Sequence, residues 1–159
     1  MFIEMKLHRL NKIVPIAFCV FLVFFASCKK NNEEDPTMST TPEITFKSIS
    51  PSSVKEYQDQ ITITISYTDG DGDLGENNPD AKNLFIIDTR NSVTYEFRIS
   101  QLAPSTDSIA IQGDLPIILN NTAITDGSSS QSVSYGVYVQ DLAGNNSNMV
   151  FTGTVTITQ

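Results

Sequence analysis

Apolar and polar residues alternate with a period of two along several short stretches of this chain. The clearest stretch is 61–67, where three Ile and one Tyr alternate with Thr, Thr and Ser. Successive side chains of a β-strand point to opposite faces, so such a stretch buries one face and leaves the other in water. β-Branched and aromatic residues, which strands favour, dominate these positions. The pattern predicts an all-β domain.

Similar stretches recur towards the C-terminus. The run 84–87 is apolar on both faces, which predicts a central strand that is covered on both sides. The run 108–119 contains Gly and Pro, so it is one strand or two. In the last stretch, Phe151, Val155 and Ile157 are expected to share the buried face. We expect about seven strands, at 43–49, 61–67, 83–88, 93–99, 108–119, 133–139 and 151–157.

Short strands without a long helical pattern predict an antiparallel β-sandwich, with a small Greek-key barrel or jelly roll as the alternative. The segment 139–147 contains the run Asp-Leu-Ala-Gly-Asn at 141–145. This run resembles the D-x-A-G-N turn between the last two strands of bacterial immunoglobulin-like (Ig-like) domains, and Gly144 and Asn145 suit positive φ. The resemblance implies that residues 43–159 form an Ig-like or fibronectin-III-like domain.

Residues that catalysis often needs are missing from the predicted domain. The single His is His8, and the two Cys are Cys19 and Cys28, so residues 43–159 contain neither. This composition excludes Cys/His zinc sites and both Ser-His-Asp and Cys-His catalysis. No glycine-rich phosphate loop follows a predicted strand. We therefore expect a protein that is not an enzyme.

Cys28 follows a pattern that is typical of a secretory signal. A basic region comes first, the run 13–26 is apolar, and Ala26 and Ser27 are small. The apolar run is too short to span a bilayer comfortably, because a spanning helix needs about 20 apolar residues. The arrangement resembles the lipobox of bacterial lipoproteins, although Phe25 stands where that family usually has Leu. An uncleaved membrane anchor and a cleaved signal without lipidation are the alternatives.

The lipobox resemblance implies that residues 1–27 are removed and that Cys28 carries the lipid that attaches the protein to the membrane. Residues 28–42 are polar, with Met38 as the only sizeable apolar side chain, and predict a disordered tether. The acidic cluster 33–35 resembles the surface-export signals of lipoproteins in the Bacteroidetes group; a solvated run of charges is the plain alternative. The resemblance implies an outer-membrane lipoprotein of the cell envelope, exposed at the cell surface.

The chain is acidic, with 18 Asp and Glu against 10 Lys and Arg and a net charge of −8. Three of the basic residues lie in the predicted signal, which leaves the domain more acidic still. No basic patch is visible, so nucleic acid is excluded as a partner. Such a surface favours cation binding.

Three carboxylates follow the strongest predicted strand at alternate positions. Asp69, Asp71 and Asp73 are separated by single glycines. The spacing resembles D-x-D-x-D calcium loops, because Ca²⁺ takes six to eight oxygen ligands and needs several carboxylates on one flexible turn. These three residues therefore predict a Ca²⁺ site; a solvated Asp-Gly turn is the plain alternative.

The loop is not an EF-hand, because Leu74 stands where that loop needs Gly and the twelfth position is Asp80 rather than Glu. We place it at one pole of the sandwich. In an Ig topology the last hairpin loop lies at the same pole, which makes Asp141 a further candidate ligand. Glu76 is another.

These features favour a non-enzymatic, lipid-anchored module of the cell envelope that is stabilised by calcium and has a protein or glycan partner. One alternative is an accessory subunit of a surface adhesion, secretion or glycan-uptake assembly. The other is a carboxylate-dependent glycosidase, which needs two carboxyls about 5–10 Å apart across a cleft. The three aspartates are too close in sequence to straddle a substrate.

Overall fold

The computed structural model describes residues 38–104 and 108–159, which lie in one compact unit, Pro36–Gln159. The described residues form strands and loops only, so the fold is all-β as predicted. Cys28, the predicted signal peptide and most of the predicted tether lie outside them. In the part of the chain that is described, no helix is long and apolar enough to cross a membrane.

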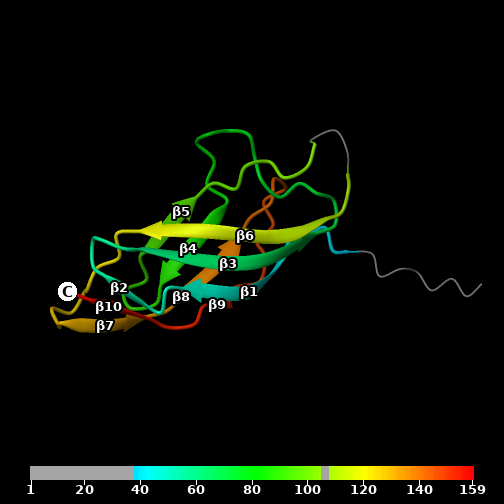
Figure 1. Ribbon diagram of the computed structural model, residues 1–159. Coiled ribbons are helices and arrows are strands. Elements are labelled where there is room, and N and C mark those ends of the chain that lie inside the picture. The colour runs from blue at the N-terminus through cyan, green and yellow to red at the C-terminus, as the bar shows by residue number, and fades with distance from the viewer. Residues whose placement is uncertain (1–37, 105–107) are drawn as a thin grey trace, which may run out of the picture. The chain divides into compact units, whose positions relative to one another are not determined.

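The strands form three sheets (Figure 1). One sheet is antiparallel and has the order β1 (Glu43–Ser50), β3 (Gln60–Asp69), β6 (Ile111–Asn120). The second, also antiparallel, has the order β5 (Thr94–Phe97), β4 (Leu84–Asp88), β8 (Tyr135–Val139), β9 (Val150–Phe151). The third has the order β2 (Ser53–Lys55), β10 (Val155–Thr158), β7 (Ser130–Val133), with β2 parallel to β10.

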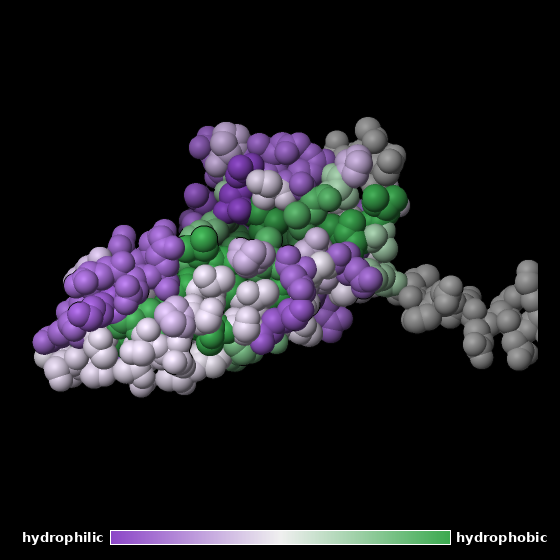
Figure 2. Space-filling model, in the orientation of Figure 1, coloured by the Kyte–Doolittle hydropathy of each residue, from purple (hydrophilic) through white to green (hydrophobic). Residues whose placement is uncertain are grey.

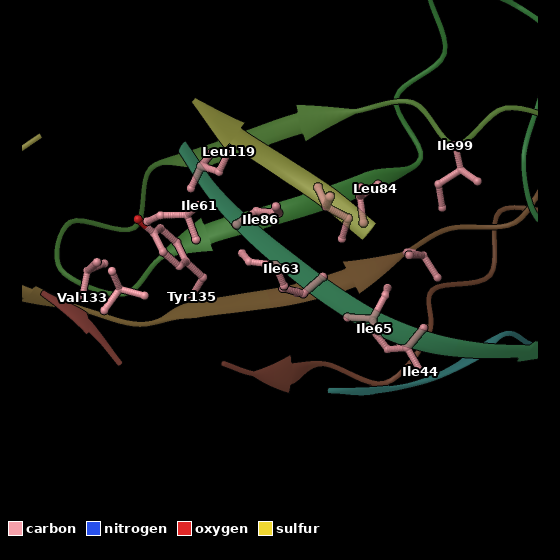
Figure 3. Packing of buried hydrophobic residues seen from close by; sticks show 14 of the residues in the cluster. Ile44, Ile61, Ile63, Ile65, Leu84, Ile86, Ile99, Leu119, Val133 and Tyr135 are labelled. Atoms are coloured by element: carbon pink, nitrogen blue, oxygen red, sulfur yellow. The ribbon is translucent and has the colours of Figure 1, made fainter. Parts of the chain in front are cut away.

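A single hydrophobic core joins all three sheets, with its centre between the two larger ones. The alternate residues Ile61, Ile63 and Ile65 of β3 are fully buried, as the period-two pattern predicts. They face buried side chains of the other sheet, such as Ile86 of β4 and Tyr135 of β8 (Figure 3). Burial of this continuous apolar surface is the main favourable term in folding.

The number of strands differs from the expected seven because two predicted strands are each divided and one was not foreseen. The segment 133–139 is divided at Ser134, and 151–157 is divided between β9 and β10. The strand that was not foreseen, β2, has three residues and only one buried side chain. The segment 108–119, with its Gly and Pro, forms the single strand β6.

Phe151 is on the opposite side from the one we expected. Val155 and Ile157 are fully buried, but Phe151 is 63% exposed. The chain leaves the sheet between these residues, where Thr152 bonds to the backbone of Tyr135 through both its amide (2.9 Å) and its hydroxyl (3.0 Å). The alternation is therefore not continuous across Thr152.

The outward faces of the two larger sheets differ in character. Thr62, Thr64 and Ser66 project from β3, and Figure 2 shows this face as pale to purple, with apolar side chains along β6. On the outward face of the other sheet, the rings of Phe85 and Tyr138 stack with centroids 4.7 Å apart. The molecule thus carries a mixed polar and apolar face over β1, β3 and β6, and an aromatic pair on the outward face of the other sheet.

Candidate metal centre

The acidic loop begins at the buried end of β3. Asp69 is the last residue of β3 and is 0% exposed, and Asp71 and Asp73 follow in the loop to β4, half-buried. One carboxylate oxygen from each of these residues lies within 4.8 Å of the other two. Among the described residues, no other group of His, Cys, Asp or Glu gathers three potential metal ligands in this way. The structure brings together the three aspartates that the sequence singled out.

The two oxygens of each carboxylate have different surroundings. Asp69 Oδ2 accepts a hydrogen bond from the Leu74 amide (2.9 Å), and Asp73 Oδ2 accepts one from the Ala143 amide (3.1 Å). The Oδ1 atoms of Asp69, Asp71 and Asp73 are buried and have no hydrogen-bond partner. Buried polar atoms almost always have partners, because an unpaired buried polar group is costly. A cation would supply the partner that all three oxygens lack.

Burial and repulsion from neighbouring carboxylates disfavour the charged forms of Asp69 and Asp73. Burial raises the pKa of Asp69, and the Leu74 hydrogen bond opposes the shift. The charges of Asp71 and Asp141 raise this pKa further, as does a side-chain hydrogen bond with Asp71, which requires one of the two carboxyls to be protonated. Burial, with the charges of Asp141, Asp71 and Asp69, raises the pKa of Asp73 to about 6. A bound divalent cation would reverse this balance by favouring the ionised carboxylates.

The hairpin loop between β8 and β9 packs against the acidic loop. The Leu142 amide donates to the Asp73 carbonyl (3.3 Å), next to the bond from Ala143 to the Asp73 side chain. The expectation that these two loops meet at one pole is therefore confirmed.

Glycine is required where the acidic loop meets a third segment: Gly72 has φ of +74°, and a Cβ there would lie 2.2 Å from the Ile109 carbonyl oxygen.

Asp141 and Glu76, the two further candidate ligands, are not part of the group of three carboxylates. Asp141 is 6% exposed and close enough to raise the pKa of Asp69 and Asp73, but both its oxygens accept bonds from Asn145, at 2.7 and 2.9 Å. The backbone of Glu76 bonds to the segment around Ile99. That Asp141 and Glu76 are metal ligands stays a prediction.

Sequence reasoning missed the groups that orient the carboxylates. The amides of Leu74 and Ala143 leave no trace in a sequence, because every residue except proline carries one. Asn145 did leave a signal, since it is part of the D-x-A-G-N turn. Its role there is to hold Asp141 rather than to adopt positive φ, which Gly144 does (+87°) and Asn145 does not.

The arrangement suits a hard divalent cation. Carboxylate oxygens are the ligands that Ca²⁺ prefers, and three of them approach from one loop without a competing hydrogen bond. The side chains of Asp71 and Asp73 are half-buried, whereas that of Asp69 is fully buried. No protein-family model, curated protein or solved structure matches this chain.

Proposed function

We propose that this protein is a non-enzymatic, lipid-anchored module of the bacterial cell envelope whose Ig-like domain is stabilised by Ca²⁺. The observation that carries the calcium proposal is the set of three buried Oδ1 atoms without partners, on Asp69, Asp71 and Asp73. Extracellular modules bind Ca²⁺ with Kd of about 10⁻⁴–10⁻³ M. At a hundredfold excess over Kd, binding adds about 2.7 kcal/mol to the free energy of unfolding.

The order of the strands supports an Ig-like sandwich. β1, β3 and β6 form one layer, and β5, β4 and β8 with β9 form the other. This is the order A-B-E and C′-C-F-G of an Ig domain if the divided segments 130–139 and 150–158 are each counted as one strand. The parallel pairing of β2 with β10 then adds a short strand beside the last one.

The carboxylates are better suited to holding an ion than to hydrolysis. Glycosidases place two carboxyls on either side of a substrate, about 5 Å apart or more. Here Asp69 is fully buried, and one oxygen from each aspartate lies within 4.8 Å of the others. A substrate could not pass between them.

The decisive experiment is a thermal melt of the purified full-length protein in detergent, in EDTA and in millimolar CaCl₂ or MgCl₂. We expect a rise of several degrees in Tm with calcium and a smaller one with magnesium, which keeps more of its waters. Equal Tm values in EDTA and calcium would contradict the ion site.

The anchor is tested separately. Cys28→Ala removes the proposed lipid attachment point, and two or more acyl chains are needed for stable anchoring. We expect the variant to leave the membrane fraction when cells are fractionated. Retention in that fraction would show that lipidation of Cys28 is not what holds the protein there.

A further inference from the structure

The residues at the start of β1 and just before it are hydrogen-bonded to the loops of the metal centre. We call residues 38–44 the lead-in segment; it ends with the first two residues of β1, and Pro42 and Ile44 within it are buried. The Gly70 amide donates a hydrogen bond to the Ser39 carbonyl (2.7 Å). Gly70 stands between Asp69 and Asp71, so this bond joins the lead-in segment to the part of the loop that presents the carboxylates.

The contact at Gly70 leaves no space for a side chain. A Cβ at this position would lie 2.2 Å from the Met38 carbonyl oxygen and 2.7 Å from that of Ser39. The lead-in backbone thus crosses directly over the acidic loop. A side chain at residue 70 would therefore push the two backbones apart at this point.

A second fastening joins the lead-in segment to the other loop of the metal centre. The Asn148 side chain accepts a hydrogen bond from the Ile44 amide (2.9 Å) and donates one to the Ile44 carbonyl (2.8 Å). Asn148 lies in the loop between β8 and β9, which also holds Asp141. Both loops that surround the three aspartates therefore form hydrogen bonds with the lead-in segment.

We propose that cation binding at Asp69, Asp71 and Asp73 controls whether the lead-in segment is docked on the domain. This inference rests on the ion site of the proposed function, for which the fully buried Asp69 with its unpartnered Oδ1 is the independent sign of a missing ligand. Without the ion, the carboxylates repel one another and the loop around Gly70 opens. With the ion, the acidic loop is fixed and the lead-in segment stays docked on it.

The coupling is reciprocal. If the ion favours the docked segment, then docking favours the ion by the same factor, which for coupled sites is about 5- to 150-fold. A variant that cannot dock the segment is therefore expected to bind calcium more weakly by a factor in this range, even though all its carboxylates are present.

The first test is hydrogen exchange of the full-length protein in detergent, in EDTA and in calcium. We expect calcium to slow exchange most at the amides of Gly70 and Ile44, which make the two fastenings. Amides of β8, in the middle of the core, serve as the internal reference.

The second test compares Gly70→Ala with Gly153→Ala. The first substitution forces the lead-in segment away, whereas a Cβ at Gly153 meets its nearest atom, Ile49 Cγ2, at an ordinary 3.5 Å. We expect calorimetric titration to show about 5- to 150-fold weaker Ca²⁺ binding for Gly70→Ala and unchanged binding for Gly153→Ala. If Gly70→Ala does not fold, Asn148→Ala loosens the same segment from the other loop and is expected to weaken binding in the same direction.

The outcomes separate the two proposals. Calcium that binds, without slowing exchange at Gly70 and Ile44 and with equal affinity for wild type, Gly70→Ala and Asn148→Ala, would overturn the docking proposal and leave the ion site standing. No calcium binding to the wild type would overturn both.

Discussion

Each of the three aspartates has one buried carboxylate oxygen without a hydrogen-bond partner, and this distinguishes it from the aspartate of an ordinary Asp-Gly turn. The same chain provides the comparison: Asp126, followed by Gly127, uses its Oδ1 to accept hydrogen bonds from the amide (2.9 Å) and the hydroxyl (2.6 Å) of Ser128. That carboxylate finds its hydrogen-bond donors within its own turn, as Asp commonly does. The Oδ1 atoms of the acidic loop have no such partner, although they are buried.

Asp71→Asn is expected to lower Tm by several degrees in calcium and to leave it unchanged or slightly raised in EDTA. With calcium, the variant loses one charged ligand; without it, the variant loses only a charge that repels its neighbours. Differential scanning calorimetry in both buffers measures the effect. Asp80→Asn, an exposed residue of the same loop, is the matched control. A similar loss of Tm in EDTA would show that Asp71 stabilises the loop without an ion.

In EDTA, stability is expected to rise as the pH falls from 7 to 5. The folded pKa of Asp73 is about 6, above its usual value of 3.8, so the folded state binds a proton more tightly than the unfolded state. The resulting destabilisation is complete above pH 6, shrinks as the pH falls below 6, and is absent only below the unfolded pKa of 3.8. We expect an effect on the order of 1 kcal/mol after solvent screening.

Urea unfolding at the two pH values measures this dependence, and Asp73→Asn should reduce it. In calcium the trend should reverse, because protons then compete with the ion for the carboxylate. The same pH dependence in Asp73→Asn as in the wild type would assign it to another group.

The sequence was sufficient to locate the aspartates but not to show which of their atoms are free. Alternate Asp residues separated by Gly are visible in one dimension. The Leu74 amide becomes a partner of Asp69 Oδ2 only when the acidic loop folds back on itself, and the Ala143 amide becomes a partner of Asp73 Oδ2 only when two loops meet. A residue-type pattern carries no information about such backbone donors.

At the scale of elements, hydrophobic periodicity located the strands and failed where a strand changes sheet. The stretch 61–67 keeps one partner on each side, so its alternation is regular; β3 contains all of it and extends further, from Gln60 to Asp69. The last stretch pairs first with β8 and then with β2 and β7. When a strand changes its partner, the alternation of buried and exposed residues starts anew. Gly153, which lies at the break, is the sequence signal for such an interruption.

Alanine substitutions on the two sides of this break should have very different costs. Ile157→Ala removes a fully buried side chain and is expected to lower the free energy of unfolding by about 2–5 kcal/mol. Phe151→Ala removes a side chain that is 63% exposed and is expected to change it by about 0.5 kcal/mol or less. Urea denaturation of both variants in the same calcium buffer measures the difference. Comparable losses would mean that Phe151 also faces the core.

At the scale of the whole molecule, two strands on the same flank have an unpaired edge. Among the described residues, β5 pairs only with β4, and β6 pairs only with β3. β6 is ten residues long, and a long free edge is a template for pairing with another chain. Pro116 lies in the middle of this edge. Because proline has no amide hydrogen and is tolerated only where the nitrogen faces away from the ladder, we expect Pro116 to blunt the edge.

Pro116→Thr is therefore expected to promote self-association without destabilising the monomer. The substitution restores an amide donor on the outer edge of β6 and replaces proline by a residue with high strand propensity. Sedimentation velocity over a range of protein concentrations measures the effect. Thr64→Val is the matched control, because Thr64 is paired with Pro116 on the central strand β3 and exposes no new edge. A variant that stays monomeric and unfolds at higher urea concentration would show the opposite geometry, in which the nitrogen of residue 116 faces β3 and the new donor strengthens the sheet from within.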